Sequence, residues 1–203
     1  MRLVQSIILC FAVFGFVVYL KGKKKTPSLQ ETYLERETKA NNVRKQPLTD
    51  LEYISIPSSF LPLQKNTTDP QLLEYQETIT ILSEQKIVNL TGISNTDLKL
   101  QYGAANLAAL TEYDQNFIVL ARTLNDWAHR LYELGMTDDA EGVLEFGISC
   151  RTDIKAHYLL LASIYKEQFH PERIASLIDA AGSIRSLMKN PIITALTELQ
   201  ELP

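Results

Sequence analysis

Apolar side chains recur every three or four residues over much of the chain beyond residue 69, the spacing expected of one face of an α-helix. Asp69 and Pro70 open the first such stretch with residue types typical of an N-cap and a first helical position. The pattern predicts a helix over about 70–88. The following stretch, 91–110, lacks this period and contains glycine and asparagine, so we expect an ordered loop with a short helical turn.

A helical hairpin is predicted after this loop. Thr111 begins the sequence Thr-Glu-Tyr-Asp, which resembles a capping box, and an apolar stripe continues from there to about residue 134. Gly135 is expected to end this helix, because glycine adopts positive φ without strain, and Thr137 to cap the next one. The stripes of the two helices contain small residues that allow a close approach, namely Ala128 and Ala140.

The hairpin pattern recurs after 34 residues. Under that shift, bulky apolar residues stay bulky at four positions and small residues stay small at two. The compared pairs are Leu124/Tyr158, Trp127/Leu161, Ala128/Ala162, Leu131/Tyr165, Ala140/Ile174, Leu144/Ile178 and Gly147/Ala181. Helix–turn–helix units with this period are typical of the tetratricopeptide repeat. The chain resembles that family over about 121–185, with repeat units at about 121–154 and 155–185.

The two units depart from the family pattern at three places. Thr152 stands where the family has its final proline, Ile174 where it has a small alanine, and Phe169 where it has the turn glycine. After the second unit, Asn190 is expected to cap a closing amphipathic helix with Pro191 in its first turn. Repeat arrays need such a helix to bury their last apolar face.

The resemblance implies an all-α fold of TPR-like stacked helical hairpins, a fragment of a right-handed α-solenoid, in which the first helix of each unit lines a concave groove. The corresponding face of the first predicted helix carries Arg122, Asn125 and His129, spaced three and four residues apart. Together with Tyr132 and Lys166, they are the candidate residues for binding an extended peptide or a carboxylate. The alternative is an ordinary solvated face.

The chain begins with an uncharged apolar run at 3–20. As a helix it would be about 27 Å long, close to the roughly 30 Å hydrocarbon core of a bilayer. We therefore expect a single transmembrane helix. The rival is a cleaved signal peptide, which the lack of a small-x-small site disfavours. Lysines at positions 21 and 23–25 follow the run, and basic flanks stay cytoplasmic, so the main domain is expected on that side.

Residues 21–68 are expected to be a basic flank and a linker that contains Pro27, Pro47, Pro57 and Pro62. Within it, residues 28–45 suit only a short helix with few apolar positions. The more apolar segment Leu51–Leu63 contains two prolines, which forbid a long helix or a central strand. We expect it to lie extended against the helical domain, 69–203, and to cover apolar surface.

Composition excludes several classes of function. The formal charge is −4; without the five basic residues that flank the apolar run, 15 basic residues face 24 acidic ones, or about −9. That balance argues against a nucleic-acid partner, which needs a clustered basic surface. The two cysteines, Cys10 within the apolar run and Cys150, give neither a disulfide framework nor a cysteine-rich metal site.

No pattern of catalytic residues stands out. The three histidines, His129, His157 and His170, form no metal-binding spacing, and no phosphate-binding glycine loop or nucleophile motif is present. We therefore expect no enzyme activity, no metal and no cofactor. Asn66 and Asn89 each begin an Asn-x-Thr triplet, but the expected cytoplasmic side disfavours glycosylation.

These observations predict a single-pass membrane protein that acts as an adaptor or scaffold and binds a protein or peptide partner in a groove. The alternative is a structural subunit of a membrane-associated complex or homo-oligomer, with no separate ligand. A cell-envelope enzyme is the third possibility. The sequence leaves open the partner, the topology, the oligomeric state and whether the linker fills the groove.

Overall fold

The computed structural model describes residues 29–57, 61–63 and 67–201. Within these ranges the chain forms eight α-helices, one 3₁₀ helix and no strand, which confirms the all-α prediction. None of the described helices is long and apolar enough to cross a membrane. The predicted span at 3–20 lies outside the described residues.

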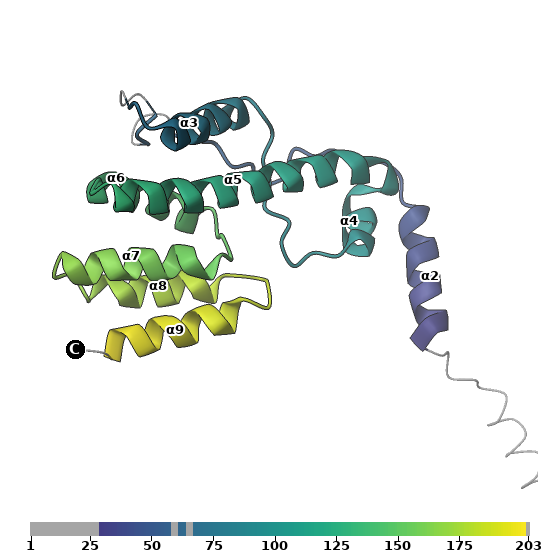
Figure 1. The fold of residues 1–203 in the computed structure, drawn as a ribbon. Helices are drawn as coiled ribbons and strands as arrows, with labels where there is room; N and C mark the ends of the chain where they lie inside the picture. The colour runs from purple at the N-terminus through teal and green to yellow at the C-terminus, as the bar shows by residue number, and fades with distance from the viewer. Residues whose placement is uncertain (1–28, 58–60, 64–66, 202–203) are drawn as a thin grey trace, which may run out of the picture.

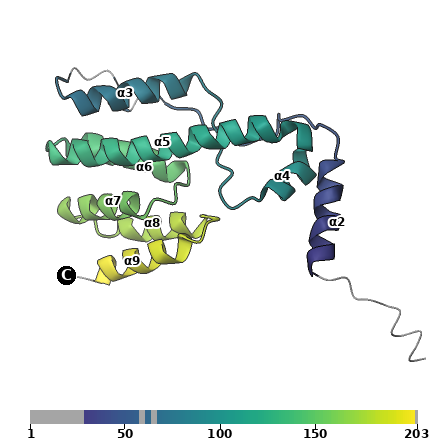
Figure 2. The same cartoon turned by 45° about the vertical axis from the view of Figure 1, so that its right-hand side comes forward.

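Most of the helices form a stack. Its layers are α3, then α5 with α6, then α7 with α8, and finally α9 (Figures 1 and 2). Away from this stack, α4 lies beside the N-terminal part of α5, and α2 lies further out, next to α4. The bounds are α2 Leu29–Asn41, α3 Pro70–Ser83, α4 Asn95–Tyr102, η1 Ala104–Asn106, α5 Leu107–Glu133, α6 Thr137–Ser149, α7 Lys155–Glu167, α8 Arg173–Gly182 and α9 Lys189–Glu201.

Several helices begin or end at residues other than those predicted. Asp69 caps α3 as expected, accepting hydrogen bonds from two backbone N–H groups, but the helix ends at Ser83 rather than near residue 88. The chain beyond α3 pairs elsewhere: the Ile87 carbonyl accepts from the Ile54 N–H at 2.9 Å, and Val88 forms an isolated bridge with Tyr53. A long-range backbone pairing therefore replaces the last predicted turn.

Three predicted N-caps are wrong. Thr111 lies inside α5, which begins at Leu107, and its hydroxyl donates to the Leu107 carbonyl at 2.8 Å. Thr137 is the first residue of α6, whose N-cap is Met136. Asn190 is the second residue of α9, which begins at Lys189. Part of the stretch 91–110 that we expected to be a loop is helical, because Ser94 caps α4.

Helix bounds in the stack are spaced 34 residues apart. The first residues of α7 and α9 are Lys155 and Lys189, and α5 and α7 end at Glu133 and Glu167. Buried or half-buried positions keep the same spacing: Leu124, Tyr158 and Ile192; Ala128, Ala162 and Leu196; Leu131, Tyr165 and Leu199. The three helices therefore turn equivalent faces toward the core.

The turns after α5 and α7 also match at this spacing. Gly135 has φ +74° and Phe169 has φ +61°, so an exposed aromatic residue adopts the left-handed conformation that glycine adopts in the earlier turn. The Met136 N–H donates to the Leu131 carbonyl at 2.9 Å, and the equivalent His170–Tyr165 bond is 2.7 Å long. The second turn thus keeps its hydrogen bonds although it lacks glycine.

Small residues occupy the centre of the stack. Ala128 of α5 and Ala140 of α6 are fully buried in one hydrophobic cluster, and so are Ala162 of α7 and Ala181 of α8. This agrees with the predicted close approach of α5 and α6. The described part of Leu51–Leu63 also packs against the domain as expected, with Leu61 buried and the Pro62 carbonyl accepting from the Gln76 side chain at 3.0 Å.

A buried histidine packs directly against a glycine. The ring of His157 is fully buried and its Nε2 donates to the Leu144 carbonyl at 2.8 Å. A Cβ atom on Gly147 would lie only 2.3 Å from Cε1 and Nε2 of that ring. Burial lowers the pKa of His157 to about 4, while its hydrogen bond to the Leu144 carbonyl opposes the shift.

The substitution Gly147→Ala should lower the free energy of unfolding by about 2–3 kcal/mol, because the added methyl overlaps the His157 ring. Gly182→Ala is the control: no atom lies within 4 Å of the position of its Cβ, so alanine should be neutral or stabilise by up to about 1 kcal/mol. Thermal unfolding followed by circular dichroism compares the two variants. Equal effects would contradict the close packing at Gly147.

Acidification should destabilise the fold through His157. The folded-state pKa of about 4 lies below the ordinary value of 6.5, so between these pH values the unfolded chain binds the proton more tightly. The free energy of unfolding should fall by about 2 kcal/mol from pH 7 to pH 5. In His157→Gln this part of the dependence should vanish, as measured by urea titration at both pH values.

Candidate functional site

Three of the candidate residues lie on one side of α5. Arg122 is exposed and forms no hydrogen bond or ion pair within the described part of the chain. His129 Nδ1 donates to the Asn125 carbonyl at 2.8 Å, which leaves Nε2 as the second polar atom of the ring. The Asn125 amide donates to Asp126 at 3.0 Å, whereas its Oδ1 is buried without a donor. Because this oxygen is buried, a ligand on the surface cannot reach it in this conformation.

The other two candidates connect neighbouring helices. The Tyr132 hydroxyl at the end of α5 donates to Glu167 of α7 at 2.5 Å, and this bond to a carboxylate raises the tyrosine pKa. Lys166 of α7 donates to the Leu199 carbonyl of α9 at 3.4 Å. The first helices of successive layers, α5, α7 and α9, are thus linked side by side.

Equivalent positions on these helices form what we term the α5–α7–α9 face. By the 34-residue spacing it consists of Arg122, Asn125 and His129 on α5; Ala156, Leu159 and Ser163 on α7; and Asn190, Ile193 and Thr197 on α9. All nine are exposed or half-buried. The face combines hydrogen-bonding groups with two apolar side chains, a mixture that suits a peptide backbone and its side chains.

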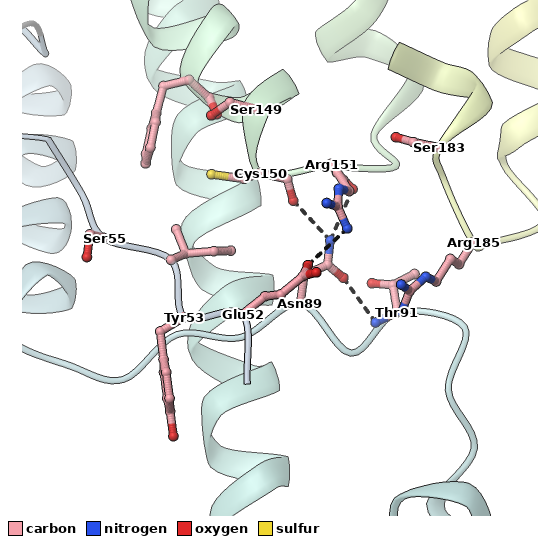
Figure 3. Close-up of a pocket in the computed structure, with 12 residues that line it drawn as sticks. Glu52, Tyr53, Ser55, Asn89, Thr91, Ser149, Cys150, Arg151, Ser183 and Arg185 are labelled. Carbon is pink, nitrogen blue, oxygen red and sulfur yellow. Dashed lines mark hydrogen bonds and ion pairs between the residues drawn. The ribbon is translucent and has the colours of Figure 1, made fainter. Parts of the chain in front are cut away.

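A separate pocket of about 290 Å³ lies where the linker crosses the ends of α6 and α8 (Figure 3). The segment Glu52–Ser55 forms one wall, and Asn89 and Thr91 come from the loop before α4. None of the five candidate residues lines this pocket. Sequence patterns missed it because its walls come from four segments that are distant in the chain.

Asn89 holds these segments together. Its amide donates to the carbonyls of Cys150 at 3.0 Å and Arg151 at 3.1 Å, and its oxygen accepts from the Thr91 N–H at 3.0 Å. The two carbonyls follow the last turn of α6, which has no intrahelical donors for them. Asn89 therefore acts as a remote cap for α6.

The pocket is lined by polar side chains, and one of its two arginines forms an ion pair. Arg151 pairs with Glu52 at 3.0 Å, whereas Arg185 has no ion pair within the described ranges. Burial raises the pKa of the Cys150 thiol to about 11, so this sulfur is protonated at neutral pH and is a poor nucleophile. The arrangement can accept a small polar group by hydrogen bonds but presents no activated nucleophile.

The sequence matches no protein-family model, no curated protein and no solved structure. The tetratricopeptide resemblance therefore stays a prediction based on the chain's own spacing and burial. Among the described residues, no three His, Cys, Asp or Glu side chains are grouped so that they could hold a metal ion.

Replacing Asn89 by alanine should lower the free energy of unfolding by about 2 kcal/mol, because two carbonyls beyond α6 lose their donor. Asn89→Asp tests the same bonds: aspartate keeps the acceptor for the Thr91 N–H but offers no donor to the carbonyls. Both variants should be destabilised in urea titrations. A stable Asn89→Asp variant would show that the donated bonds contribute little.

Proposed function

We propose that this protein is a membrane-anchored adaptor that binds an extended peptide segment of a partner protein on the α5–α7–α9 face. The observation that carries the proposal is the 34-residue spacing of three helices that lie side by side. Hydrogen bonds from Tyr132 to Glu167 and from Lys166 to the Leu199 carbonyl join them. Helical repeats commonly use the surface formed by such first helices for binding.

The spacing also supports a TPR-like repeat. The first residues of α7 and α9 are 34 residues apart, and the turns after α5 and α7 share a hydrogen-bonding pattern although the second lacks glycine. Under this proposal α9 is the closing helix of a two-unit array. The unit boundaries near 121–154 and 155–185 belong to the same proposal.

The chemistry of the face favours a peptide with a free or side-chain carboxylate. Arg122 offers a guanidinium without an ion pair within the described residues, and Nε2 of His129 can hydrogen-bond to a peptide backbone. Half-buried Leu159 and Ile193 would contact an apolar side chain between these polar groups. Two repeat units give a small surface, so the affinity should be modest.

The membrane part of the proposal depends on residues 3–20. Their uncharged length matches the hydrocarbon core, and the lysines that follow favour a cytoplasmic helical domain. An anchored adaptor would concentrate its partner at the bilayer surface, which compensates for a weak binding site.

A photo-crosslinking amino acid placed at Arg122 or at Thr197 should capture the partner in cells, because both side chains are exposed on the α5–α7–α9 face. Asp179 is the matched control, since it is exposed on α8, outside the face. Mass spectrometry of the adducts should identify one shared protein at the two sites on the face. The triple variant Arg122→Ala/Asn125→Ala/His129→Ala should bind this protein at least about tenfold more weakly.

Adducts with the same protein at Asp179, or unchanged affinity of the triple variant, would contradict binding at this face. Adducts only with a second copy of the chain would instead favour the structural, homo-oligomeric subunit. The crosslinking sites therefore separate the two functions whatever the identity of the partner.

A further inference from the structure

The N-terminal half of α2 carries an uncovered apolar stripe. Leu29 is 93% exposed and Tyr33 is 61% exposed, and both lie on the stripe that continues through Arg36 to Ala40 at spacings of four, three and four residues. Leu34 is also 55% exposed, but it lies about 100° around the helix from Tyr33 and is not part of this stripe. The stripe thus carries two large, uncovered apolar side chains in the first turns of α2.

The other end of the same stripe is covered by α4. Ala40 is fully buried, Arg36 pairs with Asp97, and Glu37 accepts from the Thr96 hydroxyl at 2.7 Å. Figures 1 and 2 show that α2 extends beyond α4 toward its own N-terminus. The helix is therefore held at one end, and its other end projects from the body of the protein.

We propose that this projecting end of α2, with Leu29 and Tyr33, lies in the headgroup layer of the membrane that anchors the chain. The inference rests on the proposed function, because it requires that residues 3–20 span the bilayer. Only eight residues, 21–28, separate Leu29 from the predicted span. Fully extended, eight residues reach about 28 Å at most, so Leu29 must stay near the bilayer surface.

The charges of this region fit the same occupant. Four of the eight connecting residues are lysines, which are attracted to anionic headgroups and favour a short distance to the surface. On α2 itself, the helical spacing puts Glu31 and Glu35 on the side opposite Leu29 and Tyr33. The apolar stripe can therefore enter the interface while the carboxylates remain in water.

The side chains are also of the kinds that membranes accept at this depth. Tyrosine is enriched at the interface, where its ring contacts apolar groups and its hydroxyl stays hydrated. Leu29 adds apolar area one turn before Tyr33 on the same side of the helix. Because the other end of α2 packs on α4, insertion would fix the orientation of the helical stack relative to the membrane.

Fluorescence quenching in vesicles tests this inference on the full chain. The protein, with Cys10→Ser and Cys150→Ala, is reconstituted into phosphatidylcholine–phosphatidylglycerol vesicles and labelled with an environment-sensitive dye at a single cysteine. The label is placed by Tyr33→Cys on the stripe or by Glu35→Cys on the opposite side of the same helix. A third variant, Ala12→Cys, reports whether the predicted span enters the bilayer.

Lipids with a quencher near the headgroup should quench the dye at residue 33, while iodide in the water should quench the dye at residue 35 more strongly. Equal iodide quenching at 33 and 35, with lipid quenching at 12, would overturn the interfacial position of α2 and leave the anchor intact. Residue 12 lies at the middle of the predicted span, so it is tested with a quencher deep in the acyl chains; lack of quenching there would overturn the anchor and this inference together. A dye at 33 shielded from iodide but not quenched by lipid would overturn the inference as well, because protein, such as a second copy, would then cover the stripe.

Discussion

The stack depends on the close approach of its helices, which small side chains make possible. Ala128, Ala140, Ala162 and Ala181 are fully buried, so bulky neighbours such as Trp127 can fill the remaining space without separating the backbones. The same constraint applies where Gly147 packs on the His157 ring, since any side chain there would collide with it.

Regular packing also explains where the two surfaces of interest lie. Since α5, α7 and α9 repeat at 34 residues, their outward positions align into one face, whose neighbouring helices are joined through Tyr132 and Lys166. The ends of α6 and α8 are brought together at another place, where the linker and Asn89 close the polar pocket of Figure 3. Both surfaces are therefore consequences of helix register.

Local patterns predicted those parts of the fold that local forces determine. Asp69 caps α3 and Gly135 takes positive φ, because each needs only its own turn. The failures occur where partners are far away: α3 stops early where Ile87 pairs with Ile54, and the contacts of Asn89 with the end of α6 are separated by 61 and 62 residues. The five candidate residues follow from helix periodicity, whereas the pocket follows from tertiary contacts that no periodicity encodes.

The most direct test of this packing is to enlarge one buried alanine and one exposed alanine of the same helix. Ala162 is fully buried in α7, while Ala156, six residues earlier in the same helix, is exposed. Urea titration should show that Ala162→Leu lowers the free energy of unfolding by about 1–3 kcal/mol and that Ala156→Leu changes it by less than about 0.5 kcal/mol. If Ala162→Leu were tolerated as well as Ala156→Leu, the helices would not be closely packed at this residue, and the stacked arrangement would be wrong.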